Sequence, residues 1–329
     1  MVYLYALIMQ QLKIYNIIFS VTLIFIISPV VVYADEAGEL KSNKKKFEFE
    51  AGTGYGILNY HIDTAAHSIL KWRDSYNFQQ NLKFKYNFRE KVFAGILFEN
   101  YILSGGEMTD DDLNNLYGTD SGVFNTTRSM KGNGHRFDFY GGYHYYTTGN
   151  TDFIGTFGVF FRKYKIRPKG VLQVGISEEF GPENKDYWVD YDNKNTQHAK
   201  ITYQGFQLGT EIHHNTSDSS KFIFDIKLII PLFYQSKQYH WGYKGPDYDW
   251  KLKQNSFIRN QGVELKMENR FKLNQYFWWG IYAYYSYIQS TNQNEIDWNW
   301  EGNPKSYIKT GNARSSALSM MGVGISAYF

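Results

Sequence analysis

Three consecutive aspartates, Asp110 to Asp112, are the residues of this chain whose types and spacing best suit catalysis. They lie in residues 103–115, LSGGEMTDDDLNN. In an extended backbone Asp110 and Asp112 point to the same side of the chain and Asp111 to the other. Two carboxylates in one space do not both ionise freely, so one keeps a proton and the pair can hold a water molecule. Acidic triplets also occur in solvated or calcium-binding loops, so the segment alone leaves both interpretations open.

The elements around this segment read as β-strands. In FEFEAGTGYG, Phe47, Phe49 and Ala51 fall on one face of a strand, and Glu48 and Glu50 fall on the other. Similar runs of period two follow at about 70–88, 91–104, 135–148, 151–167, 199–215, 219–236, 254–272, 275–290 and 314–329. The pattern predicts about ten strands, an even number, as closed bacterial outer-membrane barrels require.

The connections between the predicted strands alternate in length. Residues 87–91, 147–150, 215–220 and 273–275 are short and polar, whereas residues 63–70, 105–134, 168–197, 237–253 and 292–313 are long. Short periplasmic turns at one end and long extracellular loops at the other are typical of a transmembrane β-barrel. We therefore expect an all-β, antiparallel barrel over residues 47–329, without a second domain or internal repeats.

Aromatic residues make up 19% of the chain, which is difficult to bury between the two sheets of a water-soluble sandwich. A barrel accepts them in girdles at the two membrane interfaces. The last strand places Met321, Val323, Ile325, Ala327 and Phe329 on one face, and a final aromatic on such a strand resembles the C-terminal signal of outer-membrane barrels. The outer membrane is therefore the expected location.

The first 34 residues contain one charge, Lys13, and an apolar run that ends in VVYA. We interpret residues 1–34 as a signal peptide cleaved before Asp35, in preference to an uncleaved anchor. Residues 35–46, DEAGELKSNKKK, form a charged lead-in that we expect to be disordered. The chain has no cysteine and a formal net charge of +3, so we expect neither thiol chemistry nor a nucleic-acid partner.

Several motifs in this order resemble the omptin family of outer-membrane endopeptidases. The family pattern Gly-Gly-x-Met-x-Asp-x-Asp reads here as residues 105–112, GGEMTDDD. SILKW at 68–72, SEEF at 177–180 and SYIKTGNARSS before the last strand also resemble family segments. The resemblance implies a ten-stranded barrel with an active site in a cleft at its extracellular rim. It implies peptide cleavage by an activated water molecule, with Asp110 and Asp112 as the aspartate pair.

The resemblance places a His-Asp dyad across the cleft from this pair. The matching stretch, SKQYHW, keeps His240 in the histidine position but has Gln238 where the family has aspartate. A glutamine can orient the imidazole ring but carries no charge to stabilise the imidazolium. Either the chain is a weakened or inactive relative, or another carboxylate substitutes, for which Asp247 and Asp249 are candidates.

Other family features change as well. The acidic residues that select basic substrates correspond here to Tyr60 and Ser236, so a preference for basic residues does not follow. Lipopolysaccharide, which the family needs for activity, is expected at Lys163, although Phe161 replaces an acidic partner and Lys163 is also suited to an interfacial lysine role.

We expect a monomer without a cofactor or metal that meets peptide or protein substrates, outer-membrane lipid and lipopolysaccharide. We interpret the pair His213 and His214 as part of a solvated turn rather than a metal site. The alternative function is a non-enzymatic barrel on the same scaffold, either an adhesin or a small porin. A porin would meet the difficulty that side chains largely fill a ten-stranded interior.

Overall fold

A computed structural model provides the structure of the chain. It describes residues 46–64, 68–88, 91–112, 123–127, 130–168, 171–175, 187–190, 198–239, 250–254, 260–275, 277–293, 295–299, 307–310 and 313–329. The predicted signal peptide and nearly all of the charged lead-in lie outside these residues. The described residues form no helix that is long and apolar enough to cross a membrane.

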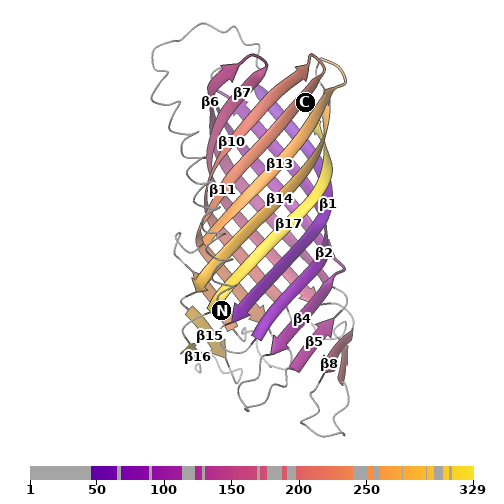
Figure 1. Cartoon of the computed structure of the whole chain (residues 1–329), viewed down its shortest axis with the longest axis vertical. Coiled ribbons are helices and arrows are strands. Elements are labelled where there is room, and N and C mark those ends of the chain that lie inside the picture. Colours follow the sequence, from indigo (N-terminus) through magenta and orange to yellow (C-terminus); the bar gives the residue numbers. More distant parts are fainter. Residues whose placement is uncertain are drawn as a thin grey trace, which may run out of the picture.

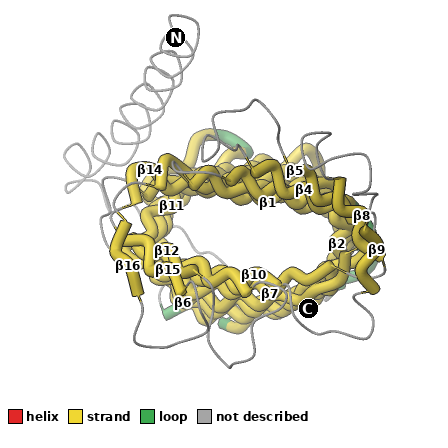
Figure 2. Tube along the Cα trace, turned by 90° about the horizontal axis from the view of Figure 1, so that it is seen from below, coloured by secondary structure: helices red, strands yellow, loops and turns green. Residues whose placement is uncertain are grey.

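Ten long antiparallel strands form a closed barrel, as the sequence pattern predicts (Figures 1 and 2). They are β1 (Phe47–Thr64), β2 (Ser68–Asn87), β3 (Val92–Ser104), β6 (Met130–Thr148), β7 (Thr151–Pro168), β10 (His198–Ser217), β11 (Ser220–Tyr239), β13 (Asn260–Lys272), β14 (Trp278–Gln293) and β17 (Ala313–Tyr328). The pairing of β1 with β17 closes the ring, and Figure 2 shows its flattened cross-section.

The other strands of the 17 are short and belong to the stretches that the sequence suggests are long loops. They are β4 (Glu107–Asp112), β5 (Val123–Thr127), β8 (Val171–Gly175), β9 (Tyr187–Asp190), β12 (Trp250–Gln254), β15 (Glu295–Asn299) and β16 (Tyr307–Thr310). In Figure 1 they gather at the lower end of the barrel, opposite the short turns. Within the long connections these short strands pair with neighbouring strands and extend the wall, a feature that the sequence pattern does not predict. The connection expected at 63–70 is also short, since β1 reaches Thr64 and β2 begins at Ser68.

The barrel wall is apolar on the outside and polar on the inside. The side chains of Met321, Val323 and Ile325 of β17 are at least half exposed, at 50%, 60% and 57%. Met320 and Ser326, on the other face of the strand, are buried. This arrangement inverts that of a water-soluble protein, because the outward face meets lipid. It confirms a transmembrane barrel and excludes the soluble sandwich.

A network of buried ion pairs crosses the middle of the barrel interior. Arg136 on β6 donates to Asp138 through Nε at 2.9 Å, to Glu264 through Nη2 at 2.9 Å and to Glu99 through Nη1 at 3.3 Å. Arg162 Nη1 on β7 lies 2.7 Å from Glu264 Oε1. Charges removed from water are tolerated when they are paired and hydrogen-bonded. The network therefore joins strands β3, β6, β7 and β13 through the interior.

Glycines on the inner face make room for large interior side chains. A Cβ built on Gly324 of β17 would lie 2.3 Å from Cζ of Tyr282, and one on Gly54 of β1 would lie 2.8 Å from the Tyr282 hydroxyl. The two glycines occupy directly paired positions of β1 and β17. The Tyr282 side chain thus packs directly against the backbone at these two glycines, and a larger residue at either position would displace it.

Toward the long-loop end, the barrel interior is a packed core. Its largest fully buried side chains include Tyr60, Trp72, Tyr101, Tyr164, Tyr203 and Tyr234, accompanied by aliphatic residues such as Leu58, Ile62, Ile166, Ile201 and Ile288. Neighbouring rings are in contact, with centroids 4.9 Å apart for Tyr203 and Tyr234 and 5.6 Å apart for Tyr101 and Tyr164. Over these described residues the barrel holds a core rather than a pore, as expected for a small barrel.

Candidate functional site at the long-loop rim

The two glycines before the aspartates have a conformation that few other residues adopt. Gly105 has a φ of 70° and Gly106 a φ of 81°, between the end of β3 and the start of β4. A Cβ on Gly106 would lie 2.4 Å from the carbonyl oxygen of Arg73 and 2.7 Å from the nitrogen of Ser75. The pair therefore lets the chain bend tightly against β2 and then resume pairing with it.

The neighbouring strands are distorted at the same level. Asp74 on β2 has a φ of 55°, and its N–H donates to Asn59 Oδ1 at 2.7 Å. The pairing of β1 with β2 shifts by one residue between Leu58 and Tyr60. Bulges of this kind redirect a strand near the rim of a barrel. The distortion lies on β1 and β2 next to Gly106, where β4 begins to pair with β2.

The aspartates belong to a strand, which corrects the interpretation of a loop. In β4 the backbone of Asp110 pairs with Leu70, and that of Asp112 pairs with Ser68, both on β2. Asp110 also pairs with Asn125 on β5. The two aspartates follow Met108 at intervals of two residues, and Met108 is buried in the interior. Asp110 and Asp112 therefore share the strand phase of the buried Met108.

Gln238 lies near the end of β11, where it pairs with Ala199 on β10 and Trp250 on β12. It follows Ser236, which is fully buried, at an interval of two residues. In the ring of ten strands, β11 is five strands from β2 in either direction, so Gln238 and the aspartate strand lie on opposite sides of the rim. His240, Asp247 and Asp249 lie outside the described residues.

Tyr60 and Ser236 meet inside the barrel although they come from β1 and β11. The Tyr60 hydroxyl donates to Ser236 Oγ at 3.0 Å and lies 2.8 Å from the hydroxyl of Tyr234. Tyr60 also packs on Trp72, with ring centroids 5.3 Å apart. The two positions at which the family carries acidic residues are therefore neighbours in space, and here they contribute hydroxyl groups and no negative charge.

Lys163 is exposed on the outer wall, on the strand that also carries the outward Phe161. It pairs with His135 on β6 and Thr202 on β10. Two further register pairs of basic residues lie closer to the rim on the same strands, Lys131 with Arg167 and Lys165 with Lys200. The outer wall thus carries a basic patch, which we define as Lys131, His135, Lys163, Lys165, Arg167 and Lys200.

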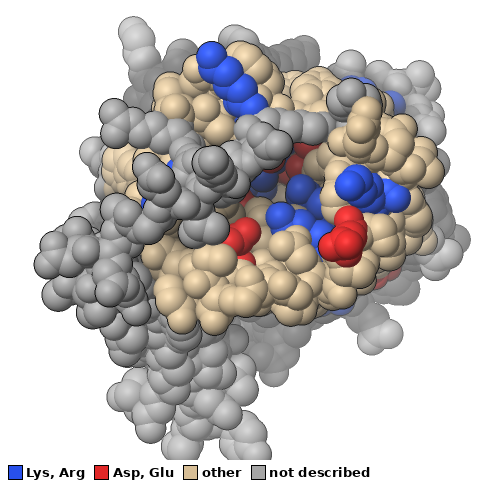
Figure 3. Space-filling view, turned by 90° about the horizontal axis from the view of Figure 1, so that it is seen from above, with Lys and Arg blue, Asp and Glu red and all other residues tan. Residues whose placement is uncertain are grey.

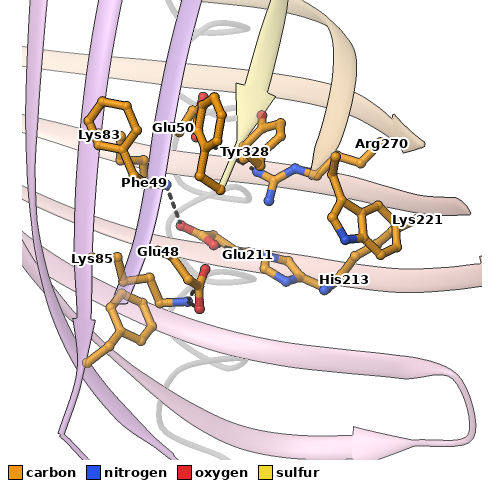
Figure 4. Close-up of a pocket in the computed structure, with 13 residues that line it drawn as sticks. Glu48, Phe49, Glu50, Lys83, Lys85, Glu211, His213, Lys221, Arg270 and Tyr328 are labelled. Carbon is orange, nitrogen blue, oxygen red and sulfur yellow. Dashed lines mark hydrogen bonds and ion pairs between the residues drawn. The ribbon is translucent and has the colours of Figure 1, made fainter. Parts of the chain in front are cut away.

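The sequence analysis missed a second site, a cavity of about 370 Å³ at the short-turn end. Figure 3 shows charged side chains inside the hollow at that end, and Figure 4 shows the lining residues. His213 belongs to this site: it is buried, and its Nε2 lies 2.9 Å from Glu211 Oε2. The expectation that His213 lies in a solvated turn is wrong, because β10 continues to Ser217. In the sequence, the signal for such a site is a set of charged residues at the inward-facing positions of the strands, close to the short turns.

No protein-family model and no curated protein matches this chain. Among solved structures, it is similar to the outer-membrane protease OmpT from Escherichia coli, with a TM-score of 0.67 and 11% identity over 87% of this chain and 99% of that one. It also matches the toluene transporter TbuX from Ralstonia pickettii, with a TM-score of 0.34 and 8% identity over 86% of this chain and 89% of that one. The outer-membrane protein OprG from Pseudomonas aeruginosa matches with a TM-score of 0.30 and 10% identity over 87% and 97%.

The TM-scores of TbuX and OprG are too low for these two structures to support any conclusion about this chain. At 11% identity, the likeness to OmpT establishes the fold alone. Together with the apolar outer face and the closed ring of strands, it identifies this chain as an outer-membrane β-barrel whose fold is similar to that of OmpT.

Proposed function

We propose that this barrel is a cell-surface endopeptidase of the omptin type, with its site at the long-loop rim. The observation that carries the proposal is the placement of the aspartate strand. Asp110 and Asp112 share the phase of the buried Met108 on β4, on the side of the rim opposite to the end of β11. The chain continues from Gln238 on β11 to His240 two residues later. This placement of the two strands supports the arrangement that the family motifs imply.

In the proposed reaction, one carboxylate of the aspartate pair holds a proton and both hold a water molecule. His240 removes a proton from this water as its oxygen attacks the peptide carbonyl, and the proton then passes to the departing amine. Gln238 orients the imidazole but cannot stabilise its positive charge. In a serine protease, replacing the supporting aspartate with a neutral amide costs about 10⁴-fold in rate. We therefore propose slow cleavage.

The contact between Tyr60 and Ser236 bears on substrate preference. A protease with acidic groups at these two positions would favour basic substrate side chains. A basic substrate side chain gains from a carboxylate, and the hydroxyl cluster provides none. We propose that neutral substrate residues are accepted next to the cleaved bond.

Lipopolysaccharide is the proposed outer-leaflet partner. The basic patch around Lys163 faces outward near the long-loop end, which is the extracellular end of such barrels. Arginine and lysine are the side chains that bind phosphate groups. The patch supports binding of phosphorylated lipid head groups, with Lys163 as one of several contributors.

The test is cleavage of a quenched-fluorescence peptide library by the refolded barrel in lipopolysaccharide. We expect slow cleavage that Asp112→Ala abolishes and that Asp218→Ala, an exposed change in the opposite turn, leaves unchanged. Gln238→Asp should raise the rate by up to roughly 10⁴-fold. Cleavage that survives Asp112→Ala would refute the assignment.

The second candidate function is a non-enzymatic surface barrel that acts as an adhesin. Gln238 and the hydroxyl pair Tyr60–Ser236 favour it, because they lack the charges of a working omptin site. Under this alternative, Gln238→Asp produces no peptidase and the barrel binds a host ligand tightly. The packed interior argues against the porin version, for which planar-bilayer recordings should show no ionic conductance.

A further inference from the structure

The cavity at the short-turn end is formed by inward side chains of several strands. Its charged lining comes from β1, β2, β10, β11 and β13 and consists of Glu48, Glu50, Lys83, Lys85, Glu211, His213, Lys221 and Arg270. Short turns of outer-membrane barrels face the periplasm. The hollow is visible from that end in Figure 3, so it is open to periplasmic solutes.

Most of the cations in this lining have a carboxylate partner. Lys85 Nζ lies 3.1 Å from Glu48, and Lys83 Nζ lies 3.9 Å from Glu211. Arg270 Nη2 lies 3.0 Å from Glu268, outside the lining, and 3.9 Å from Glu50 within it. These ion pairs neutralise three of the four lysine and arginine side chains of the lining, and one cation remains.

Lys221 is that remaining cation. Among the described residues, no carboxylate oxygen lies within 4.0 Å of its Nζ atom. Figure 4 shows Lys221, His213 and Arg270 on one side of the cavity and Lys83 and Lys85 on the other. An unpaired ammonium group in a partly enclosed site has lost hydration without gaining a counter-ion. The cavity therefore offers one positive charge to an anion.

Aromatic rings form the rest of the lining. Phe49, Phe93, Trp278, Tyr328 and Phe329 contribute apolar surface beside the charged groups. Two of the rings already carry a cation on their faces: Lys85 Nζ lies 4.3 Å from the centre of the Phe93 ring, and the Arg270 guanidinium carbon lies 3.7 Å from that of Tyr328. A ligand with both a charged group and an apolar body would match these two surfaces.

We propose that this cavity binds a small organic anion from the periplasm, with a single carboxylate or phosphate attached to an apolar ring. The anionic group pairs with Lys221, and the ring packs against the aromatic lining. A volume of about 370 Å³ is at the small end of ligand pockets, which suits a compound of one ring and its substituents. This site is independent of the peptidase proposal, because it lies at the opposite end of the barrel.

The test uses isothermal titration calorimetry on the full refolded barrel in non-ionic detergent. Benzoate and phenyl phosphate are the anionic probes, benzamide is the neutral probe and benzylamine is the cationic one. We expect saturable binding of at least one anion with a Kd below about 5 mM, and at least about tenfold weaker binding of benzamide and benzylamine. The tighter of the two anions distinguishes a carboxylate from a phosphate ligand.

Variants locate the binding. Lys221→Met removes the charge and keeps the length, and we expect it to weaken anion binding at least about tenfold. Lys221→Glu should reverse the preference, so that benzylamine binds better than benzoate. Lys91→Met, at an exposed lysine of the same end outside the cavity lining, should bind as the wild type does.

Circular dichroism and the gel mobility of the unheated barrel check that each variant is folded. If Lys221→Met does not fold, Lys221→Arg should still bind benzoate while Lys221→Glu should not. The proposal is overturned if benzoate and benzamide bind equally or if Lys221→Glu keeps the affinity for benzoate. Absence of binding by both anions at concentrations well above the expected Kd would overturn it as well.

Discussion

Gly106→Ala tests whether the glycine pair positions the aspartate strand. At this residue two penalties combine. An alanine at positive φ costs about 1–2 kcal/mol. Its Cβ would also lie 2.4 Å from the Arg73 oxygen and 2.7 Å from the Ser75 nitrogen, both backbone atoms of β2 that cannot rotate away. Overpacking of this kind costs about 1–3 kcal/mol. We therefore expect Gly106→Ala to lower the free energy of unfolding by about 2–5 kcal/mol.

Two other glycines of positive φ provide matched controls. Gly149 has a φ of 53° and nothing within 4 Å of a built Cβ, so Gly149→Ala should cost only the backbone term of about 1–2 kcal/mol. Gly105 would meet the ring of Tyr76 at 2.7 Å, but that side chain is 46% exposed and can shift more readily than backbone atoms. Gly105→Ala should therefore cost slightly more than Gly149→Ala and clearly less than Gly106→Ala.

Urea unfolding of the refolded barrels, followed by tryptophan fluorescence, measures the three losses. An unchanged denaturant slope indicates that the same surface unfolds in each variant. Because the clash displaces β4 relative to β2, Gly106→Ala should also reduce any peptidase rate more than the other two variants do. The reasoning is refuted if Gly106→Ala is no less stable than Gly149→Ala, or if Gly105→Ala is the least stable of the three.

The same unfolding assay checks three further predictions. Arg136→Met leaves three carboxylates without their shared cation and should lower the free energy of unfolding by about 3–5 kcal/mol. Arg73→Met, at an exposed arginine, should change it by no more than about 0.5 kcal/mol. Equal losses for the two variants would contradict the role of the buried network. Gly324→Ala should cost about 1–3 kcal/mol because its Cβ meets the Tyr282 ring at 2.3 Å and the backbone oxygen of Thr53 at 2.5 Å. Adding Tyr282→Leu should recover part of this loss, and no recovery would show that the backbone contact accounts for it. Ile325→Arg, in the middle of the outward apolar run, should cost about 2–4 kcal/mol, and full stability would show that this face does not meet lipid.

The strands of the barrel wall could be predicted because lipid imposes a strict alternation on them. In β1 and β17 every second residue must be apolar, so the pattern of FEFEAGTGYG and of residues 321–329 appears directly in the sequence. The extensions beyond the membrane carry no such requirement. The segment EMTDDD of β4 is poor in strand-forming residues, and its structure depends on pairing with β2 and β5.

The candidate sites could be predicted only in part, since they depend on contacts between distant strands. The aspartate spacing is local and visible in the sequence. The contact of Tyr60 with Ser236 joins residues 176 positions apart and follows from closure of the ring. His213 follows the same logic: the sequence shows it near a turn, but its partner Glu211 and the extent of β10 become apparent only in the folded barrel.

Among the described residues, the tyrosine-rich core fills the barrel between the aspartate strand at the long-loop rim and the Lys221 cavity at the short-turn end. Under the proposed peptidase function, a substrate cut at the rim releases its products on the side from which it came. A solute held near Lys221 likewise stays on the periplasmic side. Because this core separates the two proposed sites, a change of ligand at one site during evolution leaves the other site unchanged.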